Sequence, residues 1–286
     1  MVGDRQGGGD ERRPRRASND RPSKGGSSSY SGGQRQRPRD QRSVAPRSSG
    51  PGRARAAQPE GDSDKQSEAP RLSSEIEARQ LAPDVRRELV TLDKATADFV
   101  ARHLVAAGNL LDEDPTTALA HARAARSRAA RIPAVREAVG IAAYHCGDWA
   151  QALAELRAAR RMGSKSVLLP MIADCERGVG RPERAVELSR SPEAAALTGD
   201  DADELRIVAA GARADQGQFE QALLLLSSPQ LDPTKTGQTA ARLNYAYADT
   251  LLALNRNDEA LRWFINAAAA DTDGVTDAED RITELS

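Results

Sequence analysis

The sequence predicts an all-α protein: a right-handed solenoid of antiparallel helix pairs behind a disordered, basic N-terminal tail. Three observations predict this organisation. The composition changes abruptly near residue 72, apolar residues beyond that point fall at helical spacing, and one pattern recurs about every 34 residues. Only 3% of the 286 residues are aromatic, which argues against the compact core of an enzyme of this length.

The predicted tail spans residues 1–72. Residues 1–70 contain 15 Lys+Arg against 9 Asp+Glu, together with 11 Gly, 11 Ser and 7 Pro, and they hold few large apolar side chains. Such a segment buries too little surface to offset its conformational entropy, so we expect it to be disordered. Residues 71–286 carry 26 basic and 33 acidic side chains. The overall net charge of −1 is therefore the sum of a basic tail and an acidic body.

The chain shows no sign of export or of a membrane anchor. It lacks an apolar run of 18 residues, its first residues lack the apolar segment of a signal peptide, and its two cysteines do not form a disulfide framework. We therefore expect a cytoplasmic protein with no membrane partner.

Residues 73–98 are expected to form one or two N-terminal capping helices. Val85, Leu89, Leu92 and Phe99 follow one helix face, and Pro83 suits the first turn of a helix.

Five copies of one pattern follow over residues 99–270. An alanine marks each copy, with spacings of 34, 33, 37 and 38 residues. Twelve residues earlier each copy carries another small residue, which is Gly140 in the second copy. Small residues at both positions let two antiparallel helices cross closely. The aligned alanines are Ala118, Ala152, Ala185, Ala222 and Ala260.

Turn residues separate the two helices of each copy. In the second copy Gly147 suits the left-handed conformation that ends a helix, Asp148 suits the N-cap of the next helix, and Trp149 can fill the turn. In the fifth copy Asn255 takes the place of the glycine. Pro192 and Pro229 predict shortened second helices in the third and fourth copies. Residues 271–286 are expected to form a C-terminal capping helix, with a capping box over residues 276–279.

In these residues the chain resembles tetratricopeptide repeat (TPR) proteins and, in its Ala- and Arg-rich style, TPR proteins of actinobacteria. The second copy carries the TPR pattern most fully, through Val139-Gly140, Tyr144, Gly147, Trp149, Ala152 and Ala159. The fifth copy carries it through Ala248, Ala260, Phe264 and Ala267. The resemblance implies about five repeats and a concave peptide-binding face lined by the first helix of each repeat.

Transferred position by position, the resemblance implies a candidate binding face. Its polar and aromatic members are His103, Glu137, Tyr144, His145, Asp174, Arg177, Glu204, Asp215, Arg242, Tyr245 and Asp249. The basic clamp with which some TPR proteins hold a terminal carboxylate is absent from the matching positions. For each polar position, ordinary solvated helix surface is the competing interpretation.

The second helices carry a candidate basic ladder. Arginines recur at one 34-residue interval, and residues 118–165 hold 9 basic against 3 acidic side chains. Such a ladder can bind phosphates or an acidic protein, or it can simply cover apolar surface with its aliphatic stems. Its members are Arg123, Arg126, Arg157 and Arg160.

Catalytic chemistry has little support in the sequence. The three histidines and two cysteines form no metal-ligand or catalytic spacing, so we expect neither a cofactor, nor a metal, nor a small-molecule substrate. The leading hypothesis is a non-catalytic scaffold that binds an unknown protein or peptide. The alternative is an RNA- or ribosome-associated protein that uses the Arg-rich tail and the ladder.

Overall fold

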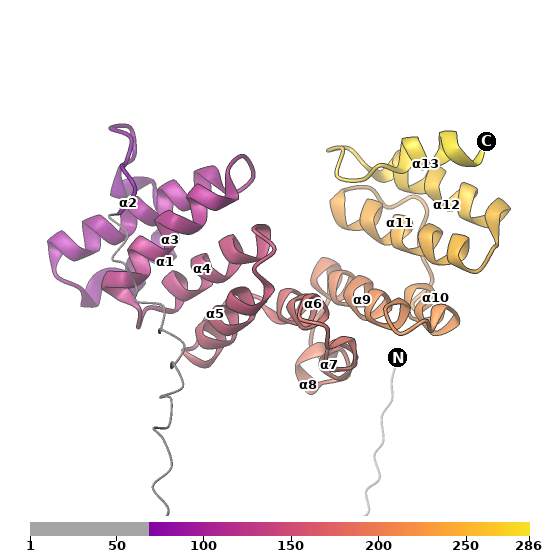
Figure 1. The fold of residues 1–286 in the computed structure, drawn as a ribbon, viewed down its shortest axis with the longest axis horizontal. Coiled ribbons are helices and arrows are strands. Elements are labelled where there is room, and N and C mark those ends of the chain that lie inside the picture. Colours follow the sequence, from indigo (N-terminus) through magenta and orange to yellow (C-terminus); the bar gives the residue numbers. More distant parts are fainter. Residues whose placement is uncertain (1–68) are drawn as a thin grey trace, which may run out of the picture. The chain divides into compact units, whose positions relative to one another are not determined.

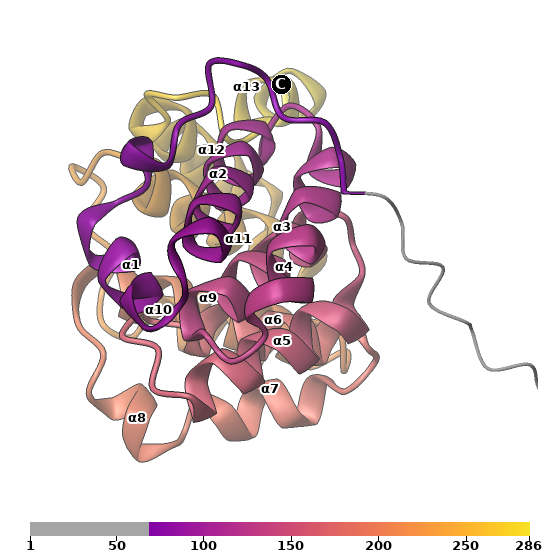
Figure 2. The same ribbon diagram turned by 90° about the vertical axis from the view of Figure 1, so that its left-hand side faces the viewer.

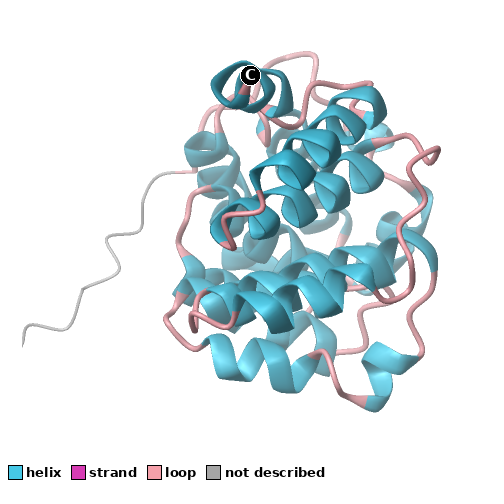
Figure 3. Cartoon of the chain, turned by 90° about the vertical axis from the view of Figure 1, so that its right-hand side faces the viewer, coloured by secondary structure: helices cyan, strands magenta, loops and turns pink. Residues whose placement is uncertain are grey.

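The computed structural model describes residues 69–286, so the predicted disordered tail, residues 1–72, lies outside this part except for its last four residues. Every regular element of residues 69–286 is helical (Figure 3). The all-α prediction is therefore confirmed for the described residues.

Helices follow one another with short connections through the whole described segment. Two 3-10 helices lie near its start, η1 (Ala78–Gln80) and η2 (Leu89–Thr91). The α-helices are α1 (Pro83–Glu88), α2 (Lys94–Leu110), α3 (Pro115–Ala129), α4 (Pro133–His145), α5 (Trp149–Arg161), α6 (Leu169–Gly178), α7 (Pro182–Leu188), α8 (Pro192–Ala195), α9 (Gly199–Ala214), α10 (Phe219–Ser227), α11 (Gln238–Ala253), α12 (Asn257–Ala270) and α13 (Ala278–Leu285).

Helices that are adjacent in sequence pack together as pairs. The pairs are α2 with α3, α4 with α5, α6 with α7, α9 with α10, and α11 with α12 (Figure 1). Contacts of α3 with α4, α5 with α6, α7 with α9 and α10 with α11 join each pair to the next. At the start of the described segment, α1 packs against α4, while η1 and η2 pack against α2. Figure 2 shows this end of the segment facing the viewer, with α1 and α2 labelled.

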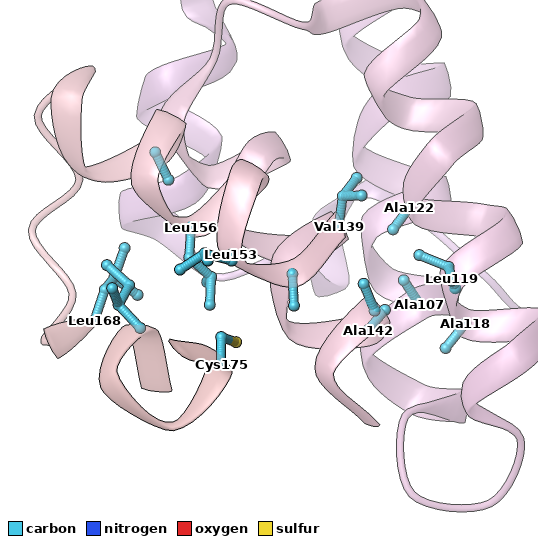
Figure 4. Packing of buried hydrophobic residues seen from close by; sticks show 14 residues of the cluster. Ala107, Ala118, Leu119, Ala122, Val139, Ala142, Leu153, Leu156, Leu168 and Cys175 are labelled. Carbon is cyan, nitrogen blue, oxygen red and sulfur yellow. The ribbon is translucent and has the colours of Figure 1, made fainter. Parts of the chain in front are cut away.

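The helix pairs cross closely where the sequence places its small residues. All five aligned alanines are fully buried. A Cβ added at Gly140 of α4 would lie 2.7 Å from the side chain of Leu156 on α5, so only glycine fits this crossing. Around it Val139, Leu153 and Leu156 form one apolar cluster with the helices on either side (Figure 4).

The predicted turn chemistry is confirmed at the ends of the helices. Gly147 has φ of 72° and Asn255 has φ of 60°, the left-handed conformation that ends a helix. The carboxylate of Asp148 accepts the backbone N–H of Gln151 at 3.1 Å and so caps α5. Trp149 then packs edge-to-face on Tyr144, with ring centroids 5.1 Å apart.

The shortened second helices are also confirmed. Helix α7 has seven residues and α10 has nine, against 13 to 15 for the second helices α3, α5 and α12. Pro192 does not extend α7 but begins the four-residue helix α8. Pro229 follows α10 directly after Ser228, which is the C-cap of that helix. Both prolines thus stand where a longer helix would need a backbone N–H.

The N-terminal helices differ from the prediction of one continuous face. Helix α1 ends at Glu88 and a 3-10 turn follows it. Asp93 then caps α2 by accepting the N–H of Thr96 at 3.0 Å. An N-cap residue has extended backbone dihedrals, so Asp93 interrupts the helical spacing and α2 starts at Lys94.

The predicted capping box at residues 276–279 is wrong. The hydroxyl and the N–H of Thr276 both donate to the carboxylate of Asp271, at 2.7 and 2.8 Å. Helix α13 therefore starts at Ala278, and its N-cap Asp277 makes no side-chain cap. An acidic residue five positions upstream has taken the backbone N–H of Thr276, which the box would pair with the side chain of Glu279.

The close helix crossings predict which alanines can be replaced by a larger residue without loss of stability. We expect Ala152→Leu to lower the free energy of unfolding by about 1–3 kcal/mol, because the added side chain overpacks the α4–α5 crossing. Chemical denaturation would measure the loss. Ala154→Leu is the matched control, since Ala154 is exposed on the same helix; equal stability of the two variants would contradict the packing described above.

Candidate functional site

An apolar cleft of about 450 Å³ lies between the N-terminal segment, α2 and α4. Val85 of α1, Leu104 and Leu111 of α2, and Ile141 of α4 contribute aliphatic side chains to its lining. Ala107 and Ala138 leave the cleft open, because neither has a side chain long enough to fill the space. Both α2 and α4 are first helices of their pairs, so the cleft lies on the side where the sequence places the binding face.

Two half-buried carboxylates border this cleft. Glu88 at the end of α1 accepts the N–H of Ala134 at 3.0 Å, which places a negative charge at the N-terminus of α4. Glu137, one turn further along α4, accepts the hydroxyl of Ser164 at 2.7 Å. These bonds fix both carboxylates at the same end of α4.

The predicted face also contains a polar network that is satisfied internally. The hydroxyl of Tyr144 donates to Asp174 at 2.5 Å, and the guanidinium of Arg177 donates to Asp174 at 2.8 Å. Arg177 also holds Asp215 through two bonds, of 2.8 and 3.2 Å. A Cβ at Gly211 would lie 2.6 Å from the guanidinium carbon of Arg177, so the glycine makes room for this bridge from α6 to α9.

The network shifts the pKa values of its members. Burial, supported by the hydrogen bond to Asp174, raises the pKa of Tyr144. Burial opposes the charge on Arg177, but the hydrogen bonds and charges of Asp215 and Asp174 outweigh it and raise the pKa of Arg177. The tyrosine therefore stays neutral and the arginine stays charged, which favours a structural bridge.

The remaining predicted residues lie on α9 and α11, apart from the cleft. Arg242 pairs with Glu204 at 3.0 Å. Asp249 lies 3.6 Å from Arg281 of α13. Tyr245 packs edge-to-face on Phe264, and burial with a hydrogen bond to Asp277 raises the pKa of Tyr245 to about 12.

The two predicted histidines of the face differ in position. His145 is exposed at the end of α4. His103 is only 1% exposed and belongs to the core, so its assignment to a binding surface is wrong. Its Nδ1 lies 2.8 Å from Nδ1 of His121 on α3, and His121 is 3% exposed. One ring donates and the other accepts, so two neutral histidines satisfy each other inside the α2–α3 pair.

The candidate basic ladder is neutralised by the neighbouring helices. Arg126 of α3 pairs with Glu155 of α5, and Arg157 of α5 pairs with Glu176 of α6. Both glutamates are buried, and Arg136 adds a second bond to Glu155 at 2.8 Å.

The two outer ladder arginines have more exposed partners. Arg123 donates to Gln151 and lies 3.6 Å from Asp148. Arg160 lies 2.5 Å from Glu193 of α8. Each of the four ladder arginines therefore reaches from its own helix to a later one.

Part of the cleft was missed at the sequence level. Leu81, Val85 and Glu88 form one wall, although their segment was predicted only as a cap. The available signal was the acidic Glu88 beside the apolar Val85 and Leu89 spacing. Of the polar and aromatic residues predicted for the face, Glu137 alone lines the cleft.

Other reactive side chains do not assemble within the described segment. Burial, with the nearby Asp174 and Glu176, raises the pKa of Cys175 to about 12, while Cys146 is exposed. Residues 69–286 contain no group of three or more His, Cys, Asp or Glu placed to hold a metal ion. In the same range, no helix combines the length and apolar character that crossing a bilayer requires.

A scan of known protein families finds no match to the chain, and a search of curated proteins finds none with significant similarity. Function is therefore inferred from the cleft, the polar network and the ion pairs described above.

The arginine–glutamate bridges predict unequal effects of two neighbouring substitutions. Arg157→Ala leaves the carboxylate of Glu176, which is 1% exposed, without its nearest cation. We expect a loss of about 1–3 kcal/mol in the free energy of unfolding. Arg160→Ala breaks only an exposed pair and should cost at most about 1 kcal/mol. Denaturant titration of both variants checks this, and an equal loss in both would contradict the burial argument.

The histidine pair predicts a loss of stability in mild acid. Burial, the neighbouring His121 and two arginines lower the pKa of His103 from 6.5 to about 4, and burial lowers that of His121. Below pH 6.5 both histidines take up protons in the unfolded chain but stay neutral in the folded protein. The free energy of unfolding therefore falls as the pH falls.

Between pH 7 and pH 5 we expect the histidine pair to cost about 1–2 kcal/mol. The double variant His103→Gln/His121→Gln should lose less stability over this range, as measured by denaturant titration at each pH. His145→Gln changes an exposed histidine and should behave as the wild type does. An unchanged pH dependence in the double variant would show that the pair does not titrate as described.

Proposed function

We propose that the helix pairs form a right-handed TPR-like solenoid and that the chain is a non-catalytic scaffold. In this proposal it binds an extended segment of another protein in the cleft between α2 and α4. One observation carries the proposal: an open apolar cleft of about 450 Å³ on the first-helix side, bordered by fixed carboxylates. Ligand sites in proteins are typically concave and mostly apolar, with a few polar groups that set orientation.

The pattern of small residues supports the repeat part of the proposal. The aligned alanines are buried, and the helix pairs contact one another in sequence order. In repeat proteins of this kind each unit contacts mainly its neighbours, and extended binding surfaces result. Short side chains at Ala107, Ala138 and Ala142 leave space on that surface for a ligand.

The alternative, RNA binding, keeps less support. Its folded component was the ladder of four arginines, and the charge of each is already matched by a side chain of a later helix. Phosphate binding depends on cations that are available to release counterions. RNA binding would therefore depend mainly on the basic composition of residues 1–59, which lie outside the described segment.

A peptide selection tests the scaffold proposal. Peptides selected on the immobilised full chain would be labelled and measured by fluorescence anisotropy. We expect Ile141→Asp to weaken binding about tenfold or more, because a carboxylate in the apolar lining loses the burial of the ligand. Ile265→Asp is the matched control, since Ile265 is 49% exposed on α12, outside the cleft. Selection of no peptide, or equal binding by both variants, would refute the proposal.

A further inference from the structure

We infer that the cleft selects a basic-aliphatic segment: an extended peptide whose Arg or Lys side chain sits between Glu88 and Glu137 while its aliphatic neighbours cover the apolar lining. This inference rests on the proposed peptide-binding function and adds the chemical class of the ligand. The charge of the two carboxylates, their remaining hydrogen-bonding capacity and the shape of the cleft all favour this class.

Hydrogen bonds hold both carboxylates in place, but each bond uses only one of the two carboxylate oxygens. The Oε2 atoms of Glu88 and Glu137 accept the Ala134 N–H and the Ser164 hydroxyl. Neither Oε1 atom accepts a hydrogen bond from residues 69–286, and neither glutamate forms an ion pair within that range. Each side chain therefore offers one acceptor from a fixed position, without the entropic cost of ordering a mobile side chain.

The placement of the two carboxylates fits a cation with several donors. Glu88 bonds to Ala134 and Glu137 lies three residues later, so both carboxylates lie within one turn of α4. A guanidinium presents five N–H donors in a planar fork, and an ammonium presents three. Either group has enough donors to bond more than one carboxylate oxygen of the lining, whereas an acidic ligand would meet two fixed negative charges.

Two basic residues, Arg87 and Lys165, also border the cleft, but they do not offset this preference. Both are exposed, and neither is in an ion pair with residues 69–286. Long basic side chains extend their charge into water, where it is screened. The glutamates cannot move away in this manner because their hydrogen bonds hold them beside the apolar lining.

The apolar part of the cleft favours aliphatic residues on either side of the ligand's basic residue. Val85, Leu104 and Ile141 come from three helices and contribute the aliphatic part of the lining. A ligand with aliphatic residues next to its cation buries these surfaces, whereas a purely basic ligand leaves them in water. The cleft therefore favours a mixed segment over a polybasic one.

The contrast with the neighbouring network supports the choice of site. Arg177 already pairs with Asp174 and Asp215, and Arg242 with Glu204. A ligand cation would have to displace those arginines. At Glu88 and Glu137 no cation of the described segment has to leave.

Mixtures of decapeptides test the inference on the full chain. Each mixture has Leu fixed at one position and Arg, Gln or Glu fixed two positions later, and the other positions are random. Fluorescence anisotropy should show the Arg mixture binding about fivefold or more tightly than the Gln mixture, and the Glu mixture most weakly. Higher salt should reduce the difference between the Arg and Gln mixtures.

The variant Glu88→Gln/Glu137→Gln keeps the size of both side chains and one acceptor oxygen each for the Ala134 and Ser164 bonds, and it removes their charge. We expect it to bind the Arg and Gln mixtures equally and to melt close to the wild-type temperature. Glu183→Gln/Glu220→Gln removes two exposed charges elsewhere and should keep the preference for Arg.

The outcomes separate the two proposals. If the wild type binds the Arg and Gln mixtures equally, and Ile141→Asp abolishes both, the peptide site stands and the preference for a cation is refuted. If no mixture binds, both proposals fail. An Arg preference that survives Glu88→Gln/Glu137→Gln would also overturn the assignment of the cation to these carboxylates.

Discussion

The close approach of paired helices at small residues is the constraint on which the rest of the structure depends. At the α4–α5 crossing the backbone of Gly140 touches the side chain of Leu156, with no room for a methyl group. Alanine and glycine bury little apolar area themselves, so the hydrophobic stabilisation comes from the aliphatic residues beside them. Leu153, Leu156 and Ile172 supply that area and connect α4, α5 and α6 in one cluster. A body with few aromatic residues can therefore be well packed.

Arginine–glutamate ion pairs determine how one helix pair packs on the next. Arg126 and Arg157 carry their charges to Glu155 and Glu176, which belong to later helices and are buried. Burying a carboxylate costs several kcal/mol, so such a pair contributes less to net stability than to the choice of one arrangement. A sliding of one pair against the next would break the bonds from Arg126 to Glu155 and from Arg157 to Glu176. The same arginines stay partly exposed, but their charges are paired with these glutamates.

Local chemistry was predictable from the sequence and long-range pairing was not. Gly147, Asn255 and Asp148 act within a few residues of themselves, so their turn and cap roles followed from residue type. His103 needed knowledge of a partner 18 residues away, and without it a buried residue was assigned to the surface. The capping box failed for the same reason, since Asp271 competes for the donors of Thr276.

The candidate site shows this division as well. Glu137 was found because the repeat register places it on the first helix of its pair. The opposite wall, from Leu81 to Glu88, follows no repeat register, and its approach to α4 depends on how the N-terminal segment folds back. One bond from Glu88 to the N-terminus of α4 makes that approach specific. The ion pairs of the ladder likewise depend on the rotation of one helix pair against the next, which residue spacing does not encode.

The first-helix side thus divides into two regions with different capacities. From Tyr144 to Asp215 the polar groups satisfy one another, and a ligand would gain little by replacing bonds that already exist. Around Glu88 and Glu137 the carboxylates are held in place yet keep free acceptors beside an apolar surface. Affinity arises where binding satisfies groups and buries surface that the free protein leaves in water. The proposed binding site therefore lies at the N-terminal end of the described segment, where Ala107, Ala138 and Ala142 line the cleft.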